Sequence, residues 1–349
     1  MKRKKVLVTG SGGLIGSESV SHFMNLGFEV HGIDNNMRAY FFGKDGDTTW
    51  NVKRLGKLYS LYHHYNFDIR DEKKINDLVK KERFDLIIHT AAQPSHDWAA
   101  KEPMTDFSIN AVATLILLEA IRKNSKDSVF IFTSTNKVYG DNPNTLPFVE
   151  HASRYELPKH HAFFNGINES MSLDQTTHSI FGVSKCSADL MVQEYGRYFG
   201  LHTVVFRGGC LTGPNHSAAK LHGFLAYLIK CIRERIPYTI IGYKGKQVRD
   251  NIHSHDLINA FMEVYKKPKQ GEVYNIGGSR YSNVSILEAI QLVETMLDMK
   301  ARITYKPTPR IGDHQWYISD ISKFRSHYPK WEFTYSLEKI IEDMCRRTV

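Results

Sequence analysis

The stretch that decides the fold is "KVLVTGSGGLIGSE", residues 5–18. A short β-branched run leads into glycines at positions 10, 13 and 16, and an apolar helical pattern follows. Gly10 permits a tight turn, Gly13 lets the backbone approach a pyrophosphate, and Gly16 lets the helix pack close to the strand. The N-terminus of that helix would face the anion. The pattern therefore predicts a dinucleotide-binding turn.

An acidic residue at the end of the next predicted strand strengthens this interpretation. Asp34 closes the run "FEVHGID" and follows Gly10 at the distance typical of such sites. Its carboxylate can accept hydrogen bonds from both ribose hydroxyls, and its charge would repel a 2′-phosphate. We therefore expect NAD rather than NADP, although Arg38 is a residue type that can serve a phosphate.

Short apolar, β-branched runs alternate with longer helical patterns in the first part of the chain. This alternation is typical of a parallel sheet covered by helices. We predict an α/β fold with a Rossmann-type, doubly wound parallel sheet over residues 1–206, with part of 240–270 packing back on it. The predicted strands are 5–10, 28–34, 65–69, 85–91, 128–135 and 202–209, and the predicted helices are 14–26, 72–82, 104–123 and 176–199.

Shorter, mixed elements follow, with helices predicted near 219–235, 284–299 and 336–347 and strand patterns between them. We predict that 207–349 form mainly a smaller α/β lobe, which binds substrate over the carboxyl ends of the sheet. The aromatic-rich connection 37–64 is long, and it is interpreted either as a functional segment or as apolar surface cover.

Composition narrows the class of protein. No stretch approaches the ~20 apolar residues of a membrane span, and glycines break the apolar run after "MKRKKVLV" too early for a signal peptide. Cys186, Cys210, Cys231 and Cys345 lack paired spacing, which argues against a disulfide framework or a zinc site. We expect a cytoplasmic protein with no metal and no membrane partner.

The formal net charge of +9 favours anionic ligands. The basic residues are scattered apart from the "KRKK" tip, and no aromatic-basic module is visible. We therefore do not expect nucleic acid as a partner.

Several motifs together resemble extended short-chain dehydrogenases/reductases that act on nucleotide sugars. They are "VTGSGGLIG", "FDIRD", "HTAAQPS", "INAVATLILLEA", "FTSTNKVYG" and "SKCSADLMVQEY". Within the family, "TSTNKVYGD", "FGLHTVVFR" and "GKQVRDNIHSHDL" are most similar to epimerases that invert C2 of a CDP-linked sugar. The resemblance covers nearly the whole chain. It implies bound NAD, transient oxidation of a carbinol carbon to a ketone, and return of the hydride to the other face.

Other activities on the same scaffold stay open: a 4-epimerase, a dehydratase, a decarboxylase, or an NAD or nucleotide-sugar binding protein without turnover. Dehydratases of this fold place an acidic pair beside the central threonine, where this chain has Asn136 and Lys137. Elimination is therefore disfavoured.

The resemblance also implies roles for individual residues. Thr135 would hydrogen-bond the reacting sugar oxygen, and Lys185 would hold the nicotinamide ribose and keep positive charge beside the proton donor. The implied cofactor-binding residues are Gly10, Gly13, Leu14, Ile15, Asp34, Asn35, Arg38, Asp68, Ile69, Ala91, Ala92, Gln93, Asn110, Thr133 and Lys185. The implied substrate-binding residues are Gln93, Asn136, Lys137, Cys210, His222, Gln247, Arg249, Arg310 and Asp313, with Lys246 as a weaker candidate.

Phe181, in "HSIFGVSK", departs from the family pattern. The family places a tyrosine four residues before the lysine on one helix face, where the lysine lowers the pKa of the phenol so that it can act as a base. Three explanations are open: a substitution that traps a complex, a relative that binds without turnover, or another group that carries the proton. Candidates for that group are Lys185, Thr135 as a relay, Tyr139, His178 and Cys210.

The resemblance further implies a homodimer or homotetramer in which helices 104–123 and 176–199 pair with those of a second copy. The apolar run "ATLILLEAI" is compatible with that interface, and equally with a core position against the sheet.

Overall fold

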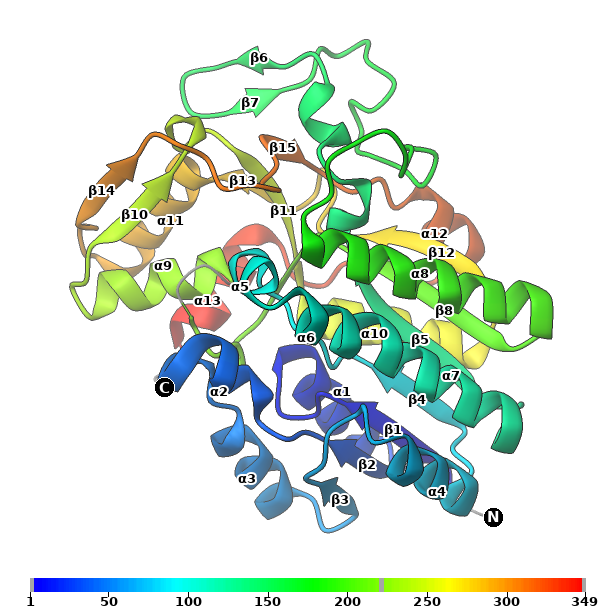
Figure 1. Cartoon of the computed structure of the whole chain (residues 1–349). Helices are drawn as coiled ribbons and strands as arrows, with labels where there is room; N and C mark the ends of the chain where they lie inside the picture. Colours follow the sequence, from blue (N-terminus) through cyan, green and yellow to red (C-terminus); the bar gives the residue numbers. More distant parts are fainter. Residues whose placement is uncertain (1–2, 220–222, 347–349) are drawn as a thin grey trace.

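A seven-stranded parallel sheet organises the computed structural model, which describes residues 3–219 and 223–346 (Figure 1). Every neighbouring pair of its strands runs parallel. The strand order reverses between β1 and β4, and open α/β sheets bind ligands at such a switch point. Across the sheet the strands are β12 (Glu272–Ile276), β8 (His202–Gly208), β5 (Val129–Thr135), β4 (Leu86–His89), β1 (Lys5–Thr9), β2 (Glu29–Ile33) and β3 (Tyr62–Tyr65). The predicted Rossmann-type α/β fold is confirmed.

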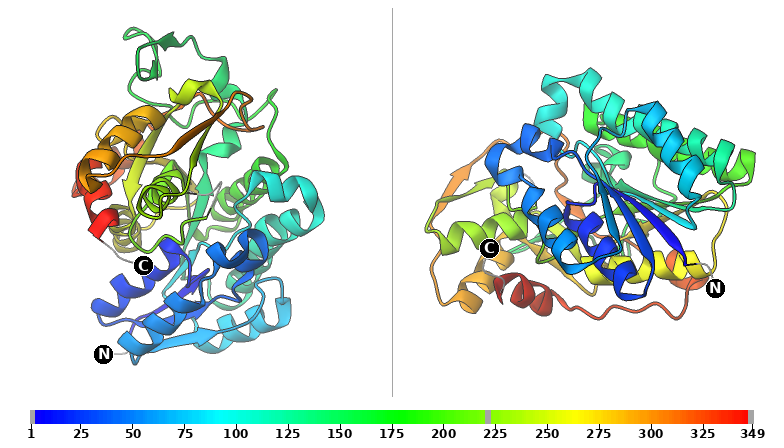
Figure 2. Two further views of the ribbon diagram at one scale, coloured as in Figure 1. Left: turned by 90° about the vertical axis from the view of Figure 1, so that its left-hand side faces the viewer. Right: turned by 90° about the horizontal axis from the view of Figure 1, so that it is seen from below.

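Helices cover both faces of the sheet (Figure 2). In β1, Val6 and Val8 point into one apolar cluster and Leu7 into the other, because successive strand residues face opposite sides. The first face is covered by α1 (Leu14–Asn25), α10 (Ser254–Lys266) and α12 (Ser322–His327), and the second by α4 (Glu72–Glu82), α7 (Ala113–Asn124) and α8 (Ile180–Phe199). Strand β12 and helix α10 show that the chain returns to the sheet after residue 206.

A smaller lobe lies over the carboxyl ends of these strands, at the left of Figure 1. In it β10 (Tyr238–Ile241) pairs with β14 (Ile303–Lys306), while β11 (Val248–His253) pairs with β9 (Cys210–Thr212), β13 (Asn283–Ser285) and β15 (Trp316–Tyr317). Its apolar core is built mainly by α9 (Phe224–Arg233), α11 (Ile286–Leu297) and α13 (Leu337–Arg346). A short hairpin, β6 (Val149–Glu150) and β7 (Tyr155–Glu156), projects at the top.

The structure corrects two predicted boundaries. The strand predicted at 65–69 lies at Tyr62–Tyr65, because Asp68 turns the chain by accepting hydrogen bonds from the backbone and side chain of Arg70. Helix α8 begins at Ile180 rather than 176, because the Ser179 hydroxyl caps it by accepting from the Gly182 N–H. The connection 37–64 contains α2 (Met37–Phe42), α3 (Thr49–Leu58) and the strand β3.

Among the described residues, one helical stretch has the length and composition to cross a membrane, contrary to the expectation from the sequence. It is Pro103–Asn124, which joins α6 (Pro103–Phe107), a π-helical turn and α7. Half of its most apolar window is buried inside the protein, as in the core helices of soluble proteins, so it is weak evidence for a membrane span.

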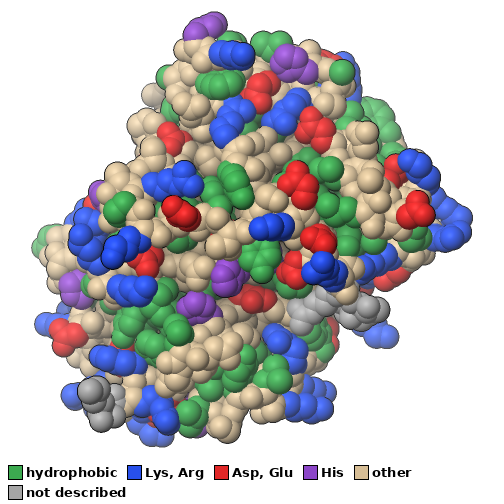
Figure 3. Space-filling model, turned by 180° about the vertical axis from the view of Figure 1, so that it is seen from behind, with side chains coloured by type: hydrophobic (Ala, Val, Ile, Leu, Met, Phe, Trp, Pro, Cys, Tyr) green, Lys and Arg blue, Asp and Glu red, His purple; other side chains and the backbone are tan. Residues whose placement is uncertain are grey.

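Charged side chains of both signs are mixed over the face of the molecule seen from behind (Figure 3). From behind, Lys and Arg side chains are spread among Asp and Glu rather than gathered in one patch (Figure 3). A single broad basic face of the kind that nucleic-acid binding uses is not visible on this side.

Candidate active site

A cavity of about 520 Å³ lies between the switch point of the sheet and the smaller lobe. Ligand sites of open α/β proteins have this position and size. Thr135, Phe181 and Lys185 all line it. So do all of the predicted cofactor-binding and substrate-binding residues that the structure describes, except Gln93, Asn110 and the weaker candidate Lys246. His222 lies outside the described residues.

The glycine turn makes one wall of the cavity. Gly10 has φ +70°, and a Cβ atom there would lie 2.9 Å from Ala91 Cα. At Gly16 a Cβ would lie 2.0 Å from the Gly10 carbonyl oxygen, so only glycine lets α1 approach the turn this closely. Gly13 occupies the N-cap and has no side chain, which leaves the first-turn N–H groups of α1 available to a pyrophosphate. The turn therefore fits a dinucleotide.

Asp34 lies beside this turn at the end of β2. Its carboxylate accepts hydrogen bonds from the backbone N–H of Gly12 (2.8 Å) and of Asn36 (2.8 Å), and from the Thr48 hydroxyl (3.2 Å). These contacts fix its orientation and leave acceptor capacity for ribose hydroxyls, since a carboxylate offers about four lone-pair positions. The arrangement fits the unphosphorylated ribose of NAD.

Two further predicted cofactor residues lie around the same end of the cavity. Arg38 donates to the Ser217 carbonyl (2.9 Å), and burial lowers the pKa of its guanidinium to about 10. Asp68 is held by Arg70 at 2.7 Å, and that hydrogen bond keeps the pKa of Asp68 below its ordinary value. Neither contact prevents these side chains from facing a ligand, because both line the cavity.

Gln93 and Asn110 do not line the cavity, so the structure does not support direct contact with cofactor or substrate. Gln93 is fully buried and donates to Asp106 Oδ1 (2.6 Å). Asn110 donates to the Gln93 carbonyl (3.0 Å) and to the Ser184 hydroxyl (3.0 Å). The buried carboxylate of Asp106 draws both amides inward, and they fix the loop after β4 against α8.

The opposite end of the cavity holds the predicted reaction centre. Thr135 ends β5, and its hydroxyl accepts the Lys137 backbone N–H at 3.2 Å. Lys185 on α8 donates to the Thr133 carbonyl (2.8 Å) and lies 4.1 Å from the centre of the Phe132 ring. Burial lowers the pKa of Lys185 to about 7, although Asp189 and Asp106 oppose the shift. Strand β5 and helix α8 thus bring the threonine and the lysine to one cavity, as the resemblance implies.

His96 is a lining residue that sequence reasoning missed. It begins α5 (His96–Lys101), and its ring packs edge-on against Phe181 with 4.9 Å between ring centroids. Its Nδ1 lies 2.6 Å from the Ser179 hydroxyl. Burial lowers the pKa of His96 to about 3, and the charges of Lys137 and Arg310 add to this shift.

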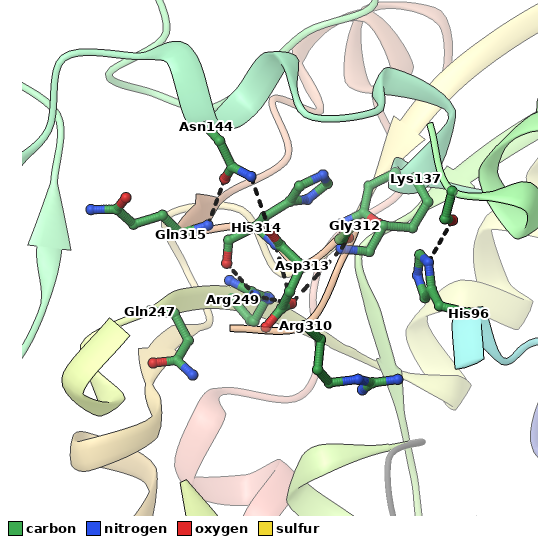
Figure 4. A network of polar contacts seen from close by, with 12 residues as sticks. His96, Lys137, Asn144, Gln247, Arg249, Arg310, Gly312, Asp313, His314 and Gln315 are labelled. Atoms are coloured by element: carbon green, nitrogen blue, oxygen red, sulfur yellow. Dashed lines mark hydrogen bonds and ion pairs between the residues drawn. The ribbon is translucent and has the colours of Figure 1, made fainter. Parts of the chain in front are cut away.

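A polar network closes this end of the cavity (Figure 4). Arg249 on β11 donates to Asp313 Oδ1 at 2.6 Å, and Lys137 Nζ donates to the Gly312 carbonyl at 2.9 Å. Burial works to raise the pKa of Asp313, but the charges of Arg249 and Lys137 outweigh it and hold that pKa below its ordinary value. Arg310 pairs with Asp97 at 2.8 Å. The cations here suit the phosphates of a nucleotide sugar.

The other proposed proton carriers are badly placed. The Tyr139 hydroxyl donates to Asn275 Oδ1 (2.7 Å) inside the protein, and the His178 ring bonds the Val138 carbonyl (2.8 Å); neither lines the cavity. Cys210 does line it, but burial raises the pKa of its thiol to about 12. Lys246, the weaker substrate candidate, does not line the cavity, and its Nζ forms an ion pair with Glu150 Oε1 at 2.8 Å.

Metal-ligand spacing occurs once among the described residues, away from this cavity. The possible ligand atoms of Glu29, His31 and His63 lie within 4.8 Å of one another on neighbouring strands. None of the three lines the cavity.

Comparisons with known proteins agree with this geometry. Residues 6–277 match the NAD dependent epimerase/dehydratase family. The CDP-paratose 2-epimerase of Salmonella typhi is 33% identical over 326 residues, which cover 91% of this chain and 92% of that protein. A dTDP-glucose 4,6-dehydratase of Salmonella typhimurium is 29% identical, covering 91% and 86%.

Two solved structures are similar over the whole chain. The UDP-glucose 4-epimerase of Thermotoga maritima with UDP-glucose has a TM-score of 0.79 at 26% identity, covering 98% of this chain and 97% of that one. A tyrosine-to-phenylalanine variant of the UDP-glucuronic acid 4-epimerase of Bacillus cereus, in complex with UDP-4-deoxy-4-fluoro-glucuronic acid and NAD, has a TM-score of 0.80 at 26% identity, covering 98% of both chains.

Proposed function

The chain belongs to the NAD-dependent epimerase/dehydratase family and is an NAD-dependent nucleotide-sugar epimerase, and from that premise we propose that it inverts C2 of a CDP-linked sugar. The observation that carries the proposal is the convergence of Thr135 and Lys185 on the cavity that also holds the dinucleotide turn. NAD, when bound, accepts a hydride from the sugar carbon and returns it to the opposite face.

The residues of the chain prepare the sugar and the cofactor for that exchange. The hydroxyl of Thr135 would hydrogen-bond the reacting sugar oxygen, and Lys185 would hold the ribose next to the nicotinamide. Arg249 and Arg310 would bind the diphosphate, because guanidinium groups match phosphate oxygens in charge and geometry. Phe181 supplies the apolar wall of this end of the cavity, where it is only 6% exposed.

The choice of cytosine rests on similarity to the CDP-paratose 2-epimerase and on Gln247. This side chain lines the cavity and donates through Nε2 to the Ile241 carbonyl (3.1 Å). That bond fixes the amide, and Oε1 is buried without a hydrogen-bond partner among the described residues. Cytosine carries an amino donor where uracil and thymine carry a carbonyl acceptor, so a buried acceptor here favours cytosine.

An NMR assay tests the reaction. The purified protein is incubated with CDP-paratose, UDP-glucose and dTDP-glucose separately, in ordinary and in deuterated water. We expect inversion at C2 of the CDP-sugar without deuterium at that carbon, because the hydride returns from the cofactor rather than from solvent. Inversion of a UDP-sugar alone would refute the choice of base, and no inversion of any nucleotide sugar would refute the catalytic proposal.

The same spectra distinguish the dehydratase alternative. Elimination of water needs an acid and a base beside the carbons that lose it. The residues that follow Thr135 in the cavity are Asn136 and Lys137, and neither is a carboxylic acid. A 4-keto-6-deoxy product would therefore contradict the proposal.

We also propose that two copies pair through α8 and the helical stretch Pro103–Asn124, and that the protein works in the cytosol. The two helices pack against each other and expose apolar side chains on their outer faces, among them Met104, Phe107, Val183, Leu190 and Met191. An exposed apolar patch of this kind fits a second copy of the chain. All four cysteines are free, as expected in a reducing compartment.

A further inference from the structure

We propose that Lys137 carries the proton that a tyrosine at position 181 would otherwise carry. This inference rests on the proposed epimerase function and names the proton-transfer residue of that same site. The sequence indicates only a substrate-binding role for Lys137, whereas the structure places this residue between Thr135 and the helix that bears Phe181.

The backbone places Lys137 between the threonine and the helix that bears Phe181. Lys137 belongs to the 3₁₀ turn Asn136–Tyr139, which continues directly from β5, and its N–H donates to the Thr135 hydroxyl (3.2 Å). On α8, a Cβ added to Gly182 would lie 2.9 Å from the Lys137 carbonyl oxygen. Gly182 therefore lets α8 approach Lys137 closely, and Phe181 is the residue immediately before Gly182 on this helix.

The side chain of Lys137 reaches the wall against which Phe181 packs. Its Nζ donates to the Gly312 carbonyl at 2.9 Å. Gly312 in turn touches His96, since a Cβ there would lie 3.0 Å from His96 Nδ1, and His96 packs on the Phe181 ring. Figure 4 shows Lys137, Gly312 and His96 together at this end of the network. The amine and the position of the missing phenol thus border the same part of the cavity.

The charge on Lys137 is only partly compensated. Asp313 lies 4.0 Å from its Nζ, but that carboxylate is bound by Arg249 at 2.6 Å. The side chain is 16% exposed. Burial lowers the pKa of Lys137 to about 8, with Asp313 opposing the shift and Arg249 adding to it. The other titratable and charged groups that face it are Arg310, Cys210, His96 and His314.

Other groups in the cavity fit the role less well. Lys185 is 3% exposed and directs its amine to the Thr133 carbonyl above the Phe132 ring, where the nicotinamide ribose would engage it. The Nδ1 atom of His96 is hydrogen-bonded to the Ser179 hydroxyl. Burial lowers the pKa of the His96 ring to about 3, so the ring binds a proton too weakly to carry it near neutral pH. Lys137 alone among these three combines access with proton affinity close to physiological pH.

The step balances without a further reagent. As the carbon–hydrogen bond at C2 breaks and its hydride leaves for NAD, the O–H bond of the C2 hydroxyl breaks and the neutral amine of Lys137 takes the proton. The sugar becomes a ketone and Lys137 an ammonium. When the hydride returns to the opposite face, the ammonium returns its proton to the oxygen, so the enzyme gains and loses nothing over one turnover.

The test compares Lys137→Met and Lys137→Arg with the wild type and with Lys80→Met, a matched control on the exposed face of α4. We expect both Lys137 variants to lose 10²–10⁴-fold in kcat, because arginine keeps the charge but cannot release a proton. The content of bound NAD should not change, and kcat should fall by a larger factor than the Kd for the nucleotide sugar rises, as expected for an interaction made in the transition state. The wild-type kcat should rise with pH through an apparent pKa near 8, and this limb should be absent from both variants.

Two further measurements separate proton transfer from a structural role. Reductive methylation with ¹³C-formaldehyde should reveal one lysine NMR signal, missing in Lys137→Arg, that titrates near pH 8, whereas solvated lysines titrate above 10. Phe181→Tyr added to Lys137→Met should restore part of the lost rate, and a double variant that gains nothing counts against the proposal. A Lys137 signal that titrates above 10, or turnover that survives Lys137→Arg, overturns it. Absence of turnover in the wild type instead refutes the epimerase function itself.

Discussion

Replacing Lys185 by methionine should stabilise the nucleotide-free protein near neutral pH while removing activity. Burial lowers the pKa of Lys185 to about 7 from the 10.5 of the unfolded chain. Between these values the unfolded chain binds the proton more often than the folded protein does, so the free energy of unfolding rises as pH rises through this window. The buried amine therefore lowers the stability of the wild type by about 4 kcal/mol at pH 7 and by only about 1 kcal/mol at pH 9.5.

Methionine has a similar shape and cannot be charged. It leaves the Thr133 carbonyl without its donor, a loss of about 1–3 kcal/mol that does not depend on pH. Urea unfolding of nucleotide-free wild type and Lys185→Met at pH 7.0 and 9.5 measures the free energy of unfolding of both proteins. Subtracting the wild-type change between the two pH values from that of the variant cancels the contribution of every other titrating group. We expect the stability difference between the two proteins to change by about 3 kcal/mol between these pH values. Parallel pH dependences would refute the buried, weakly basic lysine on which the site is built.

Three further predictions concern the cofactor and the assembly. Gly16→Ala should abolish NAD binding and lower the Tm, because the added Cβ would lie 2.0 Å from the Gly10 carbonyl oxygen. The absorbance of bound nucleotide measures the first effect and thermal unfolding the second. A variant with full NAD content would contradict the prediction. Asp34→Asn should lower the preference for NADH over NADPH by at least about 10-fold in fluorescence titrations, since one charged hydrogen bond contributes about 1.5–3 kcal/mol; an unchanged ratio would exclude Asp34 as the selector. Leu190→Asp, on the exposed face of α8, should convert a dimer into monomers in light scattering without loss of helix content, and a variant of unchanged mass would place the interface elsewhere.

The features that the sequence predicted well depend on local constraints. The glycines of residues 10–16 are required by backbone approach within a few residues, and Asp34 ends the strand that lies next to them. The β-branched runs of β1, β4, β5 and β8 form strands because both of their faces are buried under helices. The cavity therefore forms where the glycine turn and the strand ends meet.

The features that the sequence missed depend on distant partners. Gln93 lies in the loop after a strand, as a ligand-binding amide would, but the buried Asp106 on α6 turns it inward. His96 carries no local signal, because its position is set by Phe181 and Ser179, more than 80 residues later in the chain. Such tertiary contacts cannot be read from periodicity.

The charges of the cavity connect stability to ligand binding. Its lining carries the cations Arg38, Lys137, Lys185, Arg249 and Arg310 against the carboxylates Asp34, Asp68 and Asp313. Burial, rather than this excess of cations, lowers the pKa of Lys185 and with it the stability near neutral pH. Phosphates and ribose hydroxyls would favour the ammonium again, so binding of the dinucleotide takes up a proton near pH 7 and should weaken as pH rises. The burial that lowers the stability of the nucleotide-free protein thus strengthens its binding of anionic ligands.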